Sequence, residues 1–167
     1  MASISTPRDL FLQELGDILD VEKKLTDDVL PKLIDEVQRS EFKQGLKKHL
    51  DETRQHAANV EHVFNILGEQ PQPQACIGFE GLKKEHDKLA SEISADLVDF
   101  VDAGAAARTE HYEIAAYSGL IEMARALGES EAVDLLTENL KQEKEALQEV
   151  ESVTKTLRNE AKAMVSH

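Results

Sequence analysis

Apolar side chains recur every three or four residues along most of this chain, the spacing that places them on one face of an α-helix. In the N-terminal part the stripe comprises Phe11, Leu15, Ile18, Leu25, Val29 and Leu33. In the C-terminal part it comprises Val133, Leu136, Leu140, Leu147, Val150 and Leu157. Gly68 and Gly128 are typical helix-ending residues. The pattern predicts four long helices, at about residues 7–39, 41–67, 94–127 and 130–163.

The connections between these helices determine the topology. Short joins follow the first and third helices, so each should form an antiparallel hairpin with the helix after it. The middle connection, residues 68–93, is rich in proline and glycine and holds one short predicted helix at about 79–91. Pro31 should kink the first helix or end it early. We therefore predict a single all-α domain over residues 1–167, a ferritin-like four-helix bundle of two hairpins joined by a long crossover.

Acidic and imidazole side chains interrupt the apolar stripe near the middle of every predicted long helix. They are Glu22 in the first helix, His49, Glu52 and His56 in the second, Glu110 and Glu113 in the third, and Glu143 in the fourth. A carboxylate buried alone costs several kcal/mol or becomes protonated. A pair of divalent cations bound by these carboxylates would offset that cost, so the pattern predicts a dimetal site in the bundle core.

The spacing of the acidic residues supports a shared site. Glu22 and Glu52 are thirty residues apart, and Glu110 and Glu143 are thirty-three apart, so two antiparallel hairpins can bring all four to one level. Taken alone, each glutamate is more simply explained as a solvent-exposed residue of an acidic protein. A lone histidine is more simply explained as a residue on a helix face with no ligand. Their occurrence in all four helices at matching spacing favours a metal site.

Composition narrows the function classes. The 167 residues include 33 acidic and 19 basic side chains, for a formal charge of −14, which argues against nucleic-acid binding. A single cysteine excludes a disulfide framework within the chain and a cysteine-rich metal site. No apolar stretch approaches the roughly 20 residues that span a bilayer, and the N-terminus lacks the pattern of a signal peptide. We expect a cytoplasmic protein with no membrane or nucleic-acid partner.

Four segments carry a family resemblance, namely DLFLQELGDILDVEKKL, HLDETRQHAANVEHVF, EHYEIAAYSGL and ENLKQEKEAL. Together they resemble the YciE/YciF group of ferritin-like bacterial stress proteins, and the resemblance covers nearly the whole chain. It implies a homodimer with a dinuclear metal centre of the rubrerythrin or bacterioferritin type. Glu110, Glu113 and Glu143 match the Glu-x-x-Glu and later bridging glutamate of rubrerythrins, and Glu22 matches their lone first-helix glutamate.

The chain also departs from the ferritin-like pattern. Gln55 and Ala146 stand where the family's Glu-x-x-His motifs, after Glu52 and Glu143, would place histidines. The imidazoles are instead at 49 and 56, and the sequence leaves open which of them is a ligand. Nor is there a rubredoxin-like Cys-x-x-Cys module, the usual electron donor of rubrerythrins.

The leading hypothesis is a di-iron stress protein that reacts with dioxygen or peroxide, or handles iron. Glu52 and Glu143 would bridge two Fe ions, with terminal ligation by Glu22, Glu110 and Glu113. His56 would supply nitrogen, with His49 as the alternative nitrogen ligand or a partner that orients a carboxylate. Tyr117 is expected to fill the core. No catalytic residue separate from the metal ligands is predicted.

Two other hypotheses remain open at this stage. Manganese in the same site would give catalase-like disproportionation of peroxide, since oxygen-rich ligation suits manganese as well as iron. Alternatively, the protein is no enzyme and acts as an acidic helical stress protein that binds a partner.

Overall fold

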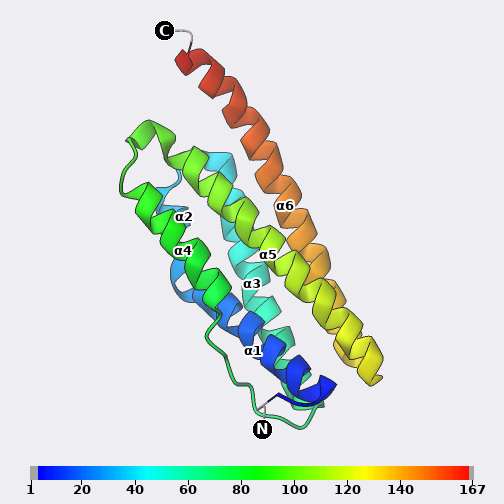
Figure 1. Cartoon of the computed structure of the whole chain (residues 1–167). Helices are drawn as coiled ribbons and strands as arrows, with labels where there is room; N and C mark the ends of the chain where they lie inside the picture. Colours follow the sequence, from blue (N-terminus) through cyan, green and yellow to red (C-terminus); the bar gives the residue numbers. More distant parts are fainter. Residues whose placement is uncertain (1–3, 166–167) are drawn as a thin grey trace.

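The computed structural model describes residues 4–165, and every regular element in that range is helical (Figure 1). The elements are α1 (Pro7–Lys24), α2 (Leu30–Glu36), α3 (Ser40–Ile66), α4 (Ile77–Ala90), α5 (Val98–Leu127) and α6 (Ser130–Val165). A π-helical turn, Leu25–Val29, joins α1 to α2, and a 3-10 turn, Ala95–Leu97, precedes α5. The all-α prediction is confirmed, and the crossover helix begins two residues earlier than expected.

Four helices form the bundle that positions the site. Helix α1 contacts α3 and α5, and α6 contacts α3 and α5 in the same way, so the four enclose one core. Helix α4 lies in the crossover and packs against α5 on the outside of the bundle (Figure 1). The C-terminal part of α6 projects beyond the other helices, at the end opposite the N-terminus (Figure 1).

Pro31 acts as the sequence predicted. It lacks an amide hydrogen and cannot donate to the carbonyl of Asp27, which an uninterrupted α-helix would require. The preceding residues form the π-helical turn, and α2 starts with Pro31 in its first turn. Helix α2 then stops at Glu36, three residues before the predicted end, because Val37 adopts an extended conformation with ψ of 137°.

The start of α1 is held by a capping box. The Asp9 amide donates to the Thr6 hydroxyl at 3.1 Å, and the Thr6 amide donates to the Asp9 carboxylate at 3.0 Å. Thr6→Ala should lower the free energy of unfolding by about 0.5–2 kcal/mol, measured by urea unfolding. Thr137→Ala, at an exposed position inside α6, is the matched control and should change it by less than about 0.5 kcal/mol. Equal effects of the two substitutions would contradict the capping role.

Three polar contacts attach the crossover segment to α1 and α5. The Gln74 amide donates to the Gly16 carbonyl at 2.9 Å, and a Cβ at Gly16 would lie only 2.7 Å from the Gln72 carbonyl oxygen. The buried Cys76 sulfur lies 2.9 Å from the hydroxyl of Tyr112 on α5. The Cys76 amide donates to the Asp20 carboxylate at 3.0 Å. These contacts close one side of the bundle.

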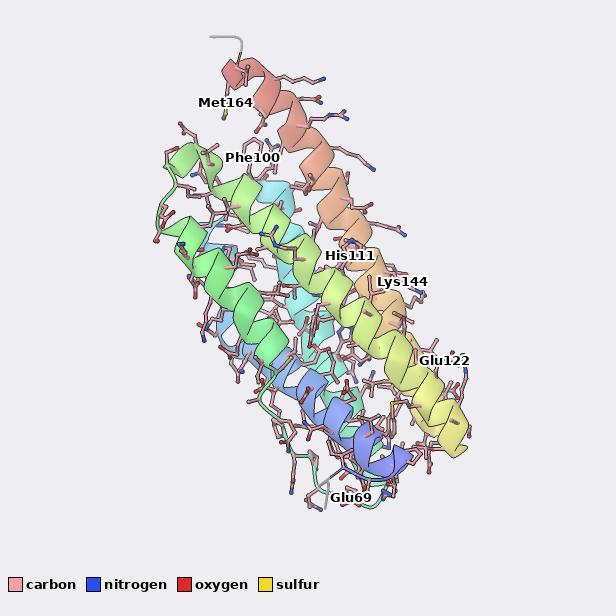
Figure 2. All side chains as sticks on the ribbon, viewed as in Figure 1. Glu69, Phe100, His111, Glu122, Lys144 and Met164 are labelled. Carbon is pink, nitrogen blue, oxygen red and sulfur yellow. The ribbon has the colours of Figure 1, made fainter. Side chains whose placement is uncertain are left out.

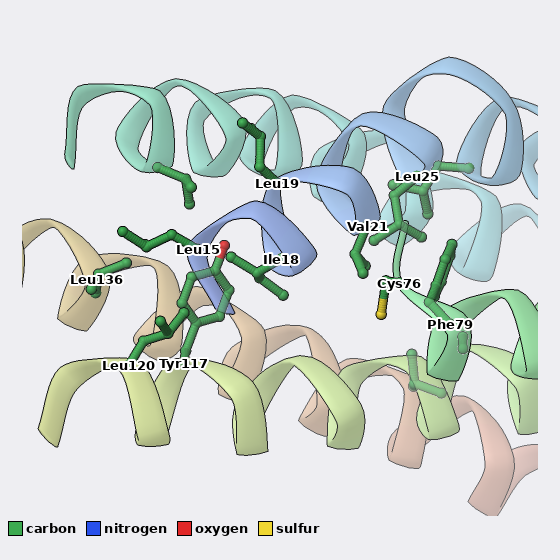
Figure 3. Packing of buried hydrophobic residues seen from close by; sticks show 14 of the residues in the cluster. Leu15, Ile18, Leu19, Val21, Leu25, Cys76, Phe79, Tyr117, Leu120 and Leu136 are labelled. Atoms are coloured by element: carbon green, nitrogen blue, oxygen red, sulfur yellow. The ribbon is translucent and has the colours of Figure 1, made fainter. Parts of the chain in front are cut away.

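The buried apolar side chains form one cluster that extends along the bundle. Leu15 and Ile18 of α1 approach Tyr117 and Leu120 of α5 (Figure 3). Farther along the bundle, Val21, Leu25, Cys76 and Phe79 form another part of the same cluster (Figure 3). All of these side chains are buried.

Part of the predicted stripe of α6 is wrong by one residue. Val133, Leu140 and Leu147 are only half-buried, and the buried residues beside them are Ala132, Asn139 and Ala146. Leu136, Val150 and Leu157 are buried as predicted. Small and polar residues therefore occupy part of the centre line of α6, and its leucines flank that line.

Polar and charged side chains lie on the outer faces of α5 and α6. His111, Glu122 and Lys144 are exposed on the outer faces of α5 and α6 (Figure 2). Among the described helices, none has an apolar stretch long enough to cross a membrane.

Candidate metal centre

Six of the seven predicted site residues meet at one level of the bundle. One group comprises His49, Glu110, Glu113 and Glu143, and the other comprises Glu22, His56 and Glu143. Within each group, one nitrogen or oxygen atom of every residue lies within 4.8 Å of those of the others. Glu143 belongs to both groups, so it is placed to bridge two ions.

Helical spacing explains how each element contributes. His49 and His56 are two turns apart on α3 and so share its inward face. Glu110 and Glu113 are one turn apart on α5, and α1 and α6 each supply one glutamate. Glu22, His56, Glu113 and Glu143 have no exposed surface, and His49 and Glu110 are also buried. Water is therefore largely excluded from the charged groups.

Each imidazole directs one nitrogen toward the carboxylates. His56 Nδ1 lies 2.8 Å from Glu143 Oε1 and 3.7 Å from Glu22 Oε1. Its Nε2 lies 2.7 Å from Gln142 Oε1, and donation of the Nε2 proton to that oxygen would leave the Nδ1 lone pair directed into the group. His49 Nε2 lies 3.3 Å from Glu110 Oε1 and 3.7 Å from Glu143 Oε2. Both histidines that the sequence singled out thus face the site, one in each group.

A network of hydrogen bonds holds the Glu22 side chain in position. The Tyr117 hydroxyl donates to Glu22 Oε1 and accepts a hydrogen bond from Asn139 Nδ2 at 3.1 Å. Asn59 Nδ2 donates to Asn139 Oδ1 at 2.7 Å. Tyr117 is fully buried, so it fills the core as expected and also holds a carboxylate. The sequence analysis did not identify Asn59 and Asn139. The pattern that could have revealed them is a polar residue at a position where the helical periodicity expects an apolar one.

Unpartnered polar atoms concentrate at this level. Eleven buried side-chain nitrogen and oxygen atoms in the described part of the chain lack a hydrogen-bond partner. Eight of them belong to the two groups, including both carboxylate oxygens of Glu113 and of Glu143. Buried polar atoms are normally satisfied, and an orphaned carboxylate is costly. Oxygen-rich ligation with one nitrogen in each group is a donor set that iron or manganese accepts, so these residues fit a pair of such ions.

Three of the four glutamates in the two groups resist ionisation in the absence of cations. Burial raises the pKa of Glu22 to about 8, against the opposing attraction of His56. Burial, followed by the charge of Glu143, raises the pKa of Glu110 and of Glu113 well above the ordinary value. Burial acts in the same direction on Glu143, but the contact with His56 and the charges of both histidines lower its pKa. A cation bound among these carboxyl groups would favour their ionised forms and so lower their pKa values.

Glu52 belongs to neither group. Its carboxylate is partly exposed and lies 3.4 Å from Lys48 Nζ and 3.7 Å from His49 Nδ1. The contact with His49 lowers the pKa of Glu52. In this arrangement Glu52 faces the outer nitrogen of His49, and the carboxylate common to both groups is that of Glu143.

A separate buried pair lies beyond the centre, between α4 and α5. His86 Nε2 lies 2.8 Å from Asp102 Oδ1, and this contact raises the pKa of His86 above 6.5 although burial opposes it. A raised histidine pKa contributes stability that is complete below pH 6.5 and is lost as the pH rises through the raised value. Asp102→Asn should therefore lower the free energy of unfolding more in acidic than in alkaline solution. Urea unfolding at both pH values checks this, and an equal loss at both would contradict it.

Comparison with known proteins agrees with the fold and the resemblance. Residues 6–163 match the family model described as Domain of unknown function (DUF892). YciF of Escherichia coli is 31% identical over 144 residues, which are 85% of this chain and 86% of that protein. The crystal structure of the E. coli stress protein YciF superposes with a TM-score of 0.86 at 29% identity, covering 93% of this chain and 98% of that one.

Two further solved structures share the fold. YcfI of Rhodopseudomonas palustris, which is provisionally described as a structural protein, has a TM-score of 0.86 at 38% identity. The superposition covers 89% of this chain and 95% of that protein. A protein of Xanthomonas campestris has a TM-score of 0.77 at 23% identity over its full length and 97% of this chain, and it supports the fold alone. This chain therefore belongs to the DUF892 family and is a relative of the E. coli stress protein YciF.

Proposed function

We propose that this protein binds two metal ions in its bundle core, iron in the leading case, and reacts with dioxygen or peroxide under stress. The ions would be held by the residues of the two groups, which are Glu22, His49, His56, Glu110, Glu113 and Glu143. The observation that carries the proposal is the cluster of six buried carboxylate oxygens on these residues that lack a hydrogen-bond partner. Ferrous ions, when bound, would supply the electrons that reduce the oxidant.

The chain's own residues would control the geometry and the charge of the site. Glu143 would join the two ion positions, because it alone belongs to both groups in the described part of the chain. Tyr117 would hold Glu22 through its hydroxyl, and Gln142 would orient His56 through Nε2. The burial of the ligands within the bundle would limit the access of bulk water to the reacting molecule. The E. coli relative is described as a stress protein, and this description supports a role of the proposed reaction in a stress response.

The test is oxidant consumption by the iron-loaded protein. Wild type should consume hydrogen peroxide or dioxygen faster than Glu143→Ala, while Glu145→Ala, an exposed position on the same helix, should match wild type. Steady release of oxygen from peroxide without a reductant would instead identify the manganese catalase-like reaction. Equal rates for wild type and Glu143→Ala with either metal would overturn the proposed reaction and favour a non-enzymatic stress protein.

A further inference from the structure

A cleft leads from the surface to the candidate metal centre between α3 and α6. Its volume is about 360 Å³, within the range of small-molecule sites. His49 and Glu110, two of the proposed metal ligands, lie at its floor. The cleft therefore has room for something larger than dioxygen or hydrogen peroxide.

The walls of the cleft are mainly apolar. Helix α3 contributes Phe42 and Leu46, and α6 contributes Val150 and Val153. All four side chains are buried in the protein but border the cleft. Gly45 widens the α3 side, where an added Cβ would meet only the flexible end of Glu149, at 3.3 Å. Apolar walls of this kind favour an apolar body in the ligand.

The mouth of the cleft is polar. Lys48 of α3 and Glu149 of α6 form an ion pair across it, with the Lys48 nitrogen 2.8 Å from a Glu149 oxygen. Both side chains are about half exposed, so the pair contributes little to stability and can yield to an entering molecule.

The floor determines the head group of the ligand. Glu110 and His49 line the floor, and the polar atoms of their side chains can form a hydrogen bond with a hydroxyl that reaches it. Among the described residues, Lys48, at the mouth, is the only lysine or arginine that lines the cleft, so a negatively charged head at the floor would lose its hydration without gaining an opposite charge.

We propose that this cleft binds a small molecule with an alkyl body and an uncharged, hydrogen-bonding head, as the organic substrate or ligand of the metal centre. The alkyl body would lie between Phe42 and Leu46 on one side and Val150 and Val153 on the other. The head would reach Glu110 and His49. The inference rests on the proposed function for what the ligand would meet at the floor, but binding in the cleft does not itself require metal.

The test uses metal-free, full-length protein with isotope-labelled leucine and valine methyl groups and 1-octanol as the probe. Octanol should cause saturable NMR shifts at the methyl groups of Leu46, Val150 and Val153. Gly45→Leu should abolish these shifts by filling the cleft, and Gly119→Leu, at an exposed position on α5, should retain them. Ser152→Leu, at the exposed rim, is a second blocking variant that avoids the interior. Octanoate, with the same body and a charged head, should leave the methyl groups unshifted.

Any one of four results would overturn the inference, the first three of which concern ligand binding. Those three are the absence of a saturable shift in wild type, unchanged shifts in both blocking variants, and equal binding of octanoate. Shifts of the same methyl groups with protein concentration alone would also overturn it, since a second copy would then cover the cleft. Metal titration of Gly45→Leu separates this inference from the proposed function. That variant should still bind two ions. If wild type binds no metal, this would contradict the proposed function but not the binding of a ligand in the cleft.

Discussion

Adding iron or manganese to the metal-free protein should raise its melting temperature by about 5–10 °C for each site that is filled. A ligand at 100 times its dissociation constant stabilises the folded state by about 2.7 kcal/mol if it does not bind the unfolded chain. In a chain of this size, 1 kcal/mol corresponds to about 2–4 °C. Metal would also provide partners for buried carboxyl oxygens that now lack a hydrogen bond.

Calorimetry or circular dichroism before and after chelation measures this shift. Glu143→Ala should show no comparable response to metal, because the variant lacks the carboxylate that both groups share. Glu145→Ala should respond like wild type. A wild-type melting temperature that is the same with metal and with chelator would contradict the account.

Substitutions in the two groups should change the number of bound ions in a pattern that identifies the shared ligand. Glu143→Ala should remove both ions, since Glu143 belongs to both groups. His56→Ala should remove one ion and leave the one held by His49, Glu110 and Glu113. His49→Ala should do the reverse, because each histidine serves one group.

Equilibrium metal titration followed by elemental analysis gives the stoichiometry of each variant. His62→Ala is the matched histidine control, since His62 lies on the same helix but is more than half exposed. The account would fail if His49→Ala and Glu143→Ala had the same metal content as His62→Ala. Loss of both ions from Glu52→Ala, with Glu143→Ala unaffected, would instead assign the bridge to Glu52.

Much of the fold follows from short-range physics. The capping box at Thr6, the glycine after α5 and the proline inside the first long helix act locally, so their effects could be predicted from neighbouring residues. The approach of the crossover to Gly16 could not. It depends on a contact between residues 16 and 74 that no local pattern encodes.

Helical periodicity could not predict which of two neighbouring residues points into the site. Steps of three and four residues both keep a side chain on one face, so the pattern could not choose between positions 52 and 53 on α3. In the structure Thr53 takes the inward position, fully buried, and its hydroxyl donates to the His49 carbonyl at 2.8 Å. Glu52 is turned toward Lys48. The same ambiguity explains the one-residue error on α6, where Asn139 is buried beside a half-buried Leu140.

The two histidines could be found from the sequence but not assigned to ions. Seven residues are two helical turns, so His49 and His56 were expected on one face, and periodicity alone left open which of them was a ligand. Packing against α1, α5 and α6 directs His49 to Glu110 and His56 to Glu22, while both also approach Glu143. The predicted homodimer and the identity of the metal remain predictions.

Metal content tests the central claim most directly. The protein should be purified without added metal and without a histidine tag, then analysed by elemental mass spectrometry as isolated and again after anaerobic loading with Fe(II). The account predicts about two ions of iron or manganese per chain, the number expected for a dimetal carboxylate bundle. No stoichiometric metal, even after loading, would contradict it and would leave a protein whose buried glutamates are protonated and hydrogen-bonded to one another.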